Sequence, residues 1–225
     1  MFARTAWAVF VKDVTVEVRS REMLATTLFF ALASVLVFAV ALVRDGRVVA
    51  DAAAGILWIA IAFSGTLALG RLFERERYAD TLRALLMAPA PRPAIYVGKL
   101  MAVLALLAVA EAMLVPLVAL LFDARLLQRP GMLLALLATG TVGFAAVGTL
   151  FSAMLSRARS RDVLLPVLLY PITIPVIIAG VRGTAALAQP VPDEAMATFW
   201  IMLLVAFDAV FVTLSLWTFD PLMTD

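Results

Sequence analysis

The feature that most constrains this chain is a series of six long apolar runs, each of 19 to 25 residues. A helix rises about 1.5 Å per residue, so about 20 residues are needed to cross roughly 30 Å of hydrocarbon. The runs therefore predict an all-α polytopic membrane protein with six transmembrane helices. The predicted spans lie at about residues 23–43, 52–70, 100–122, 131–155, 163–181 and 196–219.

Composition agrees with this class, because 64% of the 225 residues are hydrophobic, more than a soluble domain of this size buries. The loops between the spans are short, so we expect a single membrane domain over residues 1–225. We expect no cleavable signal peptide, since charged residues crowd residues 1–22 where an apolar stretch should follow a basic start.

Residues 1–22 predict an amphipathic helix that lies in the membrane interface. Its apolar face is formed by Trp7, Phe10, Val11, Val14 and Val18. The charged residues Lys12, Asp13, Arg19 and Glu22 lie away from that face. The alternative is an N-terminal lead without fixed structure.

Basic residues set the predicted orientation. With a cytoplasmic N-terminus, residues 1–22, 71–99, 156–162 and 220–225 are inside and hold 13 of the 18 Lys and Arg residues, against 5 in the outside loops. Cytoplasmic loops carry the excess of Lys and Arg, so both termini are predicted to be cytoplasmic.

A charged stretch at residues 71–99 separates the second and third spans. Charge alternates from Glu74 to Arg83, and Leu82, Leu85 and Leu86 then share one helical face. Pro89 and Pro91 end this pattern, since proline lacks the amide donor. We interpret the stretch as a short amphipathic helix at the membrane surface that docks on a soluble partner; an ordinary charged loop that orients the protein is the alternative.

The string FERERYADTLRALLMAPAPRPAIYVGK, residues 73–99, resembles the cytoplasmic signature of type-2 ABC exporter permeases. Within that group it closely resembles the heme exporter B family of the cytochrome c maturation system. The matching positions are Glu74-Arg75-Glu76, Asp80-Thr81-Leu82, Leu85-Leu86, Pro89, Arg92 and Gly98-Lys99. Ala79 stands where the family often has Gly, and Arg83 where it usually has Glu, which reverses a charge on the predicted docking face.

The resemblance implies a non-catalytic permease subunit that works with a separate ABC ATPase subunit in c-type cytochrome biogenesis. It also implies a heme-handling membrane subunit and a second copy of this chain as partners, the lipid bilayer as surroundings, and no nucleic acid. Heme would be the cargo of the complex, with no cofactor bound by this chain. The implied ATPase-coupling residues are Glu74, Arg75, Glu76, Asp80, Thr81, Leu82, Leu85 and Leu86.

Two acidic residues, Glu111 and Asp208, lie near the middle of the third and sixth spans. A charge at that depth costs at least about 2.5 kcal/mol, and no Lys or Arg lies within any span. We therefore expect both to face the bundle interior. Each could line a translocation path or tie helices together, or it could be a protonated acid satisfied by a backbone carbonyl.

Two spans contain residues expected to matter for packing or bending. Gly148 and Ser152 present a small-residue face in the fourth span that lets helices approach closely. Pro166, Pro171 and Pro175 predict a kinked or broken fifth helix, acting as a static kink or as a hinge.

Several chemistries are excluded by the residues present. The chain has no Cys and no His, which removes the common catalytic triads, zinc sites and heme axial ligands, and no metal site is expected. A Walker A motif is absent, because Pro93 stands where its first glycine would be and Leu100 follows Lys99. Two alternative functions stay open: a type-2 ABC permease for a lipid, polysaccharide or drug, and a proton-coupled secondary transporter that uses Glu111 and Asp208.

Overall fold

A computed structural model describes residues 1–44, 47–48, 52–73, 91–158 and 160–222. Within these residues it contains six helices long and apolar enough to cross a membrane, which confirms the predicted fold class. They are α2 (Glu22–Ala41), α3 (Ala53–Arg71), α6 (Arg92–Leu121), α7 (Pro130–Met154), α8 (Arg161–Ala188) and α9 (Glu194–Leu222).

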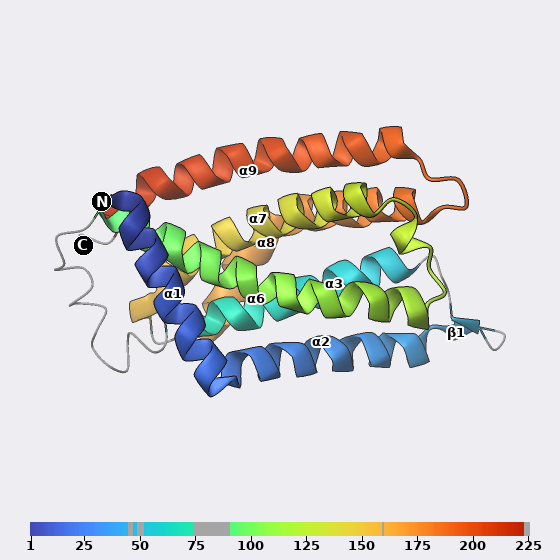
Figure 1. Cartoon of the computed structure of the whole chain (residues 1–225), viewed down its shortest axis with the longest axis horizontal. Coiled ribbons are helices and arrows are strands. Elements are labelled where there is room, and N and C mark those ends of the chain that lie inside the picture. Colours follow the sequence, from blue (N-terminus) through green and yellow to red (C-terminus); the bar gives the residue numbers. More distant parts are fainter. Residues whose placement is uncertain (45–46, 49–51, 74–90, 159, 223–225) are drawn as a thin grey trace.

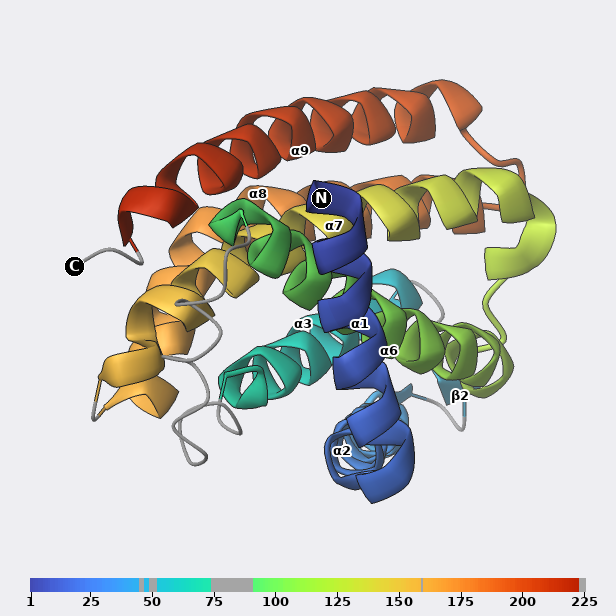
Figure 2. The same ribbon diagram turned by 60° about the vertical axis from the view of Figure 1, so that its left-hand side comes forward.

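The six long helices run side by side and alternate in direction, while α1 (Phe2–Ser20) lies across one end of the bundle (Figure 1). That end also holds the last turn of α3, the first turn of α6 and the C-terminal end of α9. Seen from a second direction, α9 lies on one side of the bundle and α2 on the other, with α3, α6 and α7 between them (Figure 2). We call the end crossed by α1 the α1 end.

The opposite end carries short connections. A two-residue antiparallel pairing of β1 (Val43–Arg44) with β2 (Arg47–Val48) joins α2 to α3. The 3-10 helix η2 (Leu126–Gln128) precedes α7, and the Nε atom of Arg129 lies 2.6 Å from Oε1 of Glu194 at the start of α9. A second 3-10 helix, η3 (Leu155–Arg157), follows α7 at the α1 end.

A sharp corner joins α1 to α2. Arg21 adopts a left-handed backbone conformation (φ 54°), which ends α1 and lets α2 begin at the next residue. Glu17 holds both sides of the corner: its carbonyl accepts the Arg21 N–H at 2.7 Å, and its Oε1 accepts the Leu24 N–H at 2.7 Å. The side chain thus satisfies one of the open amides in the first turn of α2.

The face of α1 that packs on the bundle is not the face that carries its large apolar side chains. The face that packs on α6 carries Ala6, Val9 and Asp13. Trp7 and Val18 of the predicted apolar face point outward and are 59% and 63% exposed. The helix over these residues is confirmed, and Asp13 lies away from the Trp7 face, as predicted. The surface that packs on α6 is that second face, which large apolar residues do not mark.

Two helices extend beyond the predicted spans. α6 begins at Arg92 rather than near residue 100, with Pro91 before it and Pro93 in its first turn, where no amide donor is needed. α8 continues to Ala188, seven residues past the predicted end, and stays one uninterrupted helix through Pro166, Pro171 and Pro175. Of the two predicted forms, kinked or broken, the broken helix was therefore wrong, and the kink stays a prediction.

Among the long helices, α3 and α7 are the most buried. Trp58 of α3 packs against Gly140 of α7 and Gly180 of α8, and a Cβ atom at either glycine would collide with the indole. Its Nε1–H donates to Thr184 Oγ1 at 2.9 Å, which satisfies the one polar atom of the ring. Neighbouring helices thus surround α3, and its C-terminal end lies among them.

Candidate functional site

The residues predicted to couple this chain to an ATPase lie outside the described residues. They are Glu74, Arg75, Glu76, Asp80, Thr81, Leu82, Leu85 and Leu86. The described chain stops at Phe73, just after α3, and resumes at Pro91, just before α6. The structure therefore describes the two ends that flank the predicted coupling region.

The C-terminal end of α3 is held by side chains from three other helices. The last carbonyls of a helix have no partner within it, and Leu72, which follows α3, keeps a right-handed conformation rather than forming a left-handed cap. Ser152 of α7 donates to the Leu69 carbonyl at 2.6 Å, and Arg161 of α8 donates to the Gly70 carbonyl. The third donor is Lys99 of α6, whose Nζ lies 3.0 Å from the Leu72 carbonyl oxygen. We call these three donors and three carbonyls the α3 clamp.

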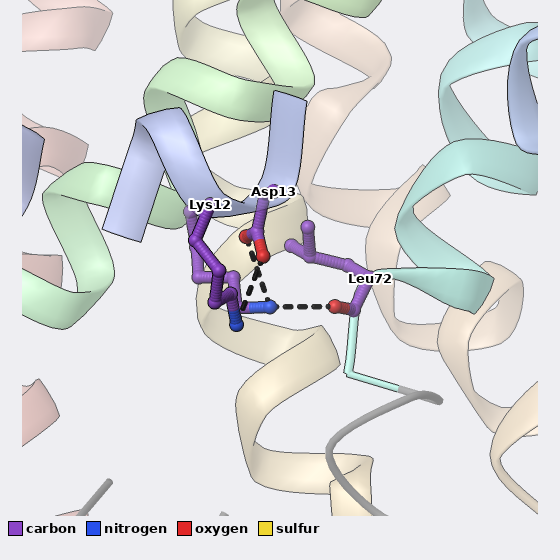
Figure 3. A network of polar contacts seen from close by, with 4 residues as sticks. Lys12, Asp13 and Leu72 are labelled. Carbon is purple, nitrogen blue, oxygen red and sulfur yellow. Dashed lines mark hydrogen bonds and ion pairs between the residues drawn. The ribbon is translucent and has the colours of Figure 1, made fainter. Parts of the chain in front are cut away.

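Lys99 is the most buried charge of the clamp, with only 2% of its side chain exposed. Its Nζ lies 3.0 Å from Oδ2 of Asp13 on α1 (Figure 3). The same atom lies 5.0 Å from the ring centre of Phe73. Asp13 also pairs with Lys12 at 3.0 Å. The ammonium group therefore meets a carboxylate, a carbonyl and an aromatic face, which compensates its removal from water.

The neighbouring Gly98 explains how α1 comes close enough for this ion pair. A Cβ atom at Gly98 would lie 2.6 Å from the Ala6 carbonyl oxygen and 2.7 Å from Val9 Cβ. Only glycine therefore permits this approach of the two helices. Gly98 and Lys99 act together, the first by admitting α1 and the second by binding it.

Electrostatics favour the clamp. The C-terminus of a helix carries a partial negative charge of about half an electron, so cations nearby are stabilising. Lys99 and Arg161 are both cations at that end, and Arg161 is itself 8% exposed with its Nε 3.6 Å from Asp162 Oδ1. The positive groups thus meet both the helix end and carboxylates.

The two intramembrane acids lie against α7. Thr141 Oγ1 of α7 donates to Glu111 Oε1, and Asp208 Oδ1 of α9 would lie 2.6 Å from a Cβ atom placed at Gly143. Asp208 Oδ1 is a buried atom with no hydrogen-bond partner among the described residues. Thr141 and Gly143 are two residues apart and so point about 200° apart around α7. Glu111 and Asp208 therefore approach α7 from opposite sides.

The structure places Gly148 and Ser152 against the same residue of α3. A Cβ atom at Gly148 would collide with the Leu69 side chain, and Ser152 bonds the Leu69 carbonyl. Pro171 and Pro175 lie on the exposed side of α8. Their suggested role as a hinge stays a prediction.

Sequence reasoning missed Lys99, Asp13 and Arg161 as partners in one cluster. The available signal was the Gly98-Lys99 pair, whose lysine falls within the first helical turns of α6 and is preceded by the residue that allows close packing. Lys99 is 86 residues from Asp13 and 27 from Leu72, and no pattern in a single sequence pairs such positions.

The fold defines a multi-pass α-helical membrane protein whose buried charges gather at one end of the bundle. The family model described as CcmB protein matches residues 4–221. The chain therefore belongs to the CcmB protein family.

Named relatives agree with this assignment. Heme exporter protein B of Haemophilus influenzae is 26% identical over 181 residues, 80% of this chain and 81% of that protein. The protein of the same name from Rhodobacter capsulatus is 30% identical over 159 residues, 68% of this chain and 72% of that protein. The Escherichia coli K12 protein is 32% identical over 96 residues, so this chain spans less than half of that relative's length (44%).

Proposed function

We propose that this chain is the membrane permease subunit of an ABC-type complex that exports heme or delivers it to the periplasm for c-type cytochrome biogenesis. The observation that carries the proposal is the family match over residues 4–221, together with relatives named heme exporter protein B. The six helices that are long and apolar enough to cross a membrane support a permease role. The chain itself performs no catalysis in this proposal.

ATP hydrolysis is assigned to a partner subunit, because the chain has no Walker A motif. The partner would dock on residues 74–88, which connect the clamped end of α3 to the start of α6. A heme-handling membrane subunit and a second copy of this chain complete the proposed complex. Heme is the cargo and is not bound by His or Cys of this chain, which has neither.

The position of the two acids favours an ATP-driven mechanism over a proton-coupled carrier. A carrier using Glu111 and Asp208 would bring both to one aqueous path, whereas they approach α7 from opposite sides. A type-2 ABC permease for a lipid, polysaccharide or drug would also need an ATPase subunit. Deleting its gene would leave cytochrome maturation intact.

The test is gene deletion with complementation. Cells lacking the gene should lose covalently attached heme in their c-type cytochromes, and a plasmid copy should restore it. An ATPase subunit should co-purify with the tagged chain after mild solubilisation. Normal c-type cytochromes in the deletion strain would contradict the heme assignment. If an ATPase subunit still co-purified with the tagged chain in the complemented strain, a permease for another substrate would then be favoured.

The proposed orientation places the α1 end in the cytoplasm of a bacterial inner membrane. The native chain has no Cys, so single cysteines need no cleared background. A cysteine at Arg77 should react with an impermeant thiol reagent only after the membrane is opened, whereas one at Gln189, at the other end, should react in intact spheroplasts. Labelling of the Arg77 position from outside would overturn the orientation.

A further inference from the structure

The α3 clamp joins helices that are distant in the sequence at the place where α3 ends. Its donors come from α6, α7 and α8, which start or end at this side of the bundle. All three donor residues are buried, so water does not replace them as partners of the carbonyls. A helix end held in this way cannot shift without breaking bonds to three neighbours.

Lys99 also connects the end of α3 to two other helices, α6 and α1. It lies on α6 and bonds the carbonyl of Leu72, so it links the two helices that flank residues 74–90. The same ammonium group pairs with Asp13 (Figure 3). It also lies over the ring of Phe73, the last described residue before that stretch. A displacement of either flanking end therefore acts on α1, α3 and α6 together.

The two outer helices contribute no donor to the α3 clamp. At this end α9 contacts α6 through Arg92 Nη1, 3.5 Å from Asp220 Oδ1, and through the ring of Phe219, whose centre lies 5.4 Å from that of Tyr96. The Asp220 side chain is 62% exposed, and exposed pairs of this kind contribute little. The first turn of α2 is joined to α1 through the Leu24 N–H, which donates to Glu17. The clamp thus groups five helices and leaves α2 and α9 outside it.

From this arrangement we infer that Lys99, Ser152 and Arg161 are positioning residues through which motion at the ATPase-docking end is transmitted to α1, α3, α6, α7 and α8. The inference rests on the proposed function, since it assumes that a partner ATPase acts on residues 74–88. Loss of a clamp bond should leave ATP hydrolysis intact and lower the transport obtained from it. Mutations along such coupling networks change coupling by between about twofold and thirtyfold.

The experiment uses the intact complex purified in lipid with its ATPase subunit. Three quantities are measured for each variant: ATPase subunit recovered per copy of this chain, ATP hydrolysis rate, and holo-cytochrome c formed in cells. Lys99→Met removes the charge but keeps an unbranched apolar chain, and Lys99→Arg is the conservative variant expected to restore coupling. Ser152→Ala removes a single oxygen and remains informative if Lys99→Met fails to fold.

Two matched controls separate the clamp from general effects. Lys12→Met removes another lysine that pairs with Asp13 and is not one of the three donors of the α3 clamp. Ser34→Ala removes a serine hydroxyl that bonds the carbonyl of Phe30 within its own helix. Both controls should keep the ratio of holo-cytochrome c to ATP hydrolysed within twofold of the wild-type ratio.

We expect Lys99→Met and Ser152→Ala to lower that ratio by more than twofold with normal recovery of the ATPase subunit. An unchanged ratio in both variants would overturn the inference and leave the proposed function standing. A loss of output that matches a loss of assembled complex would also overturn it, since the role would then be only structural. If the wild-type chain neither recovers an ATPase nor supports cytochrome maturation, the proposed function fails and the inference fails with it.

Discussion

The two polar regions of this bundle are built on opposite plans. At the α1 end, Lys99 and Arg161 are buried with carboxylates and helix carbonyls as partners. Near the middle of the bundle, Glu111 meets a threonine hydroxyl, and Asp208 Oδ1 meets the backbone near Gly143. The charges at the end are compensated by charges, whereas the central acids have neutral neighbours. Depth in the membrane explains the difference, because an ionised group is costliest at the centre.

This comparison predicts where substitutions matter. A paired buried charge cannot lose one partner cheaply, since the other is left uncompensated. A neutral hydrogen bond within a membrane bundle contributes on average only about 0.6 kcal/mol. Substitutions that remove a charge at the α1 end should therefore lower the free energy of unfolding more than isosteric substitutions of Glu111 and Asp208.

The largest effect is expected for Lys99→Met. The change leaves Asp13 and the Leu72 carbonyl without their shared cation, and breaking a buried pair costs about 3–5 kcal/mol. Thermal unfolding in detergent should show a clear fall in midpoint, with Lys12→Met close to wild type. A Lys99→Met protein as stable as wild type would mean that the cluster contributes nothing to the fold.

The next largest effect is expected for Gly98→Val. The added side chain would meet the Ala6 carbonyl and Val9 Cβ, neither of which can rotate away, and overpacking of this kind costs about 1–3 kcal/mol. Limited proteolysis should release α1 faster than in wild type. Gly55→Val is the matched control, since a Cβ at Gly55 has no heavy atom of another residue within 4 Å. Equal cleavage of the two variants would contradict the close packing of α1 on α6.

A smaller effect is expected on partner binding when Glu74 and Glu76 are both changed to Lys. Exposed charge pairs each contribute up to about 1 kcal/mol, so the double change should weaken ATPase association about tenfold and each single change less. Co-purification at graded salt measures the association, and membrane insertion should be unaffected. Recovery of the ATPase equal to wild type would remove these residues from the docking surface.

The smallest effects are expected for Glu111→Gln and Asp208→Asn. Both keep shape, and the Gln side chain can still accept from Thr141, so unfolding midpoints should change little. Because neither acid has a cation among its described contacts, cytochrome maturation should also persist. Loss of maturation with normal assembly would instead assign an ionising step to that acid.

The sequence predicted much of the bundle and little of the α3 clamp. The six spans, the amphipathic N-terminal helix and the inward position of Glu111 follow from hydropathy and from the cost of a buried charge. The packing face of α1 did not follow, because the pattern weights large apolar residues, and those point outward in α1. Ala6 and Val9 form the contact because Gly98 has no side chain, which lets α1 approach α6 closely.

The same limit applies to the charged residues. Lys99 counted toward orientation as one of several basic residues near a membrane boundary, and only the preceding Gly98 sets it apart from Arg92 in the sequence. In the structure, Lys99 differs from Arg92 by its burial. That burial depends on α1 and the end of α3, which both contact the Lys99 side chain. Such partners are set by the tertiary fold, and sequence periodicity describes only one helix at a time.

The most direct test of this account is a pair of double-mutant cycles on unfolding in detergent. One cycle combines Lys99→Met with Asp13→Leu, and the other combines Glu111→Leu with Thr141→Val, so that each single change removes the interaction measured. Interaction energies in such cycles range from about 0.5 to 3 kcal/mol, and the account predicts a value near the upper end for the first and near the lower end for the second. An equal or larger interaction energy for Glu111 and Thr141 would contradict it.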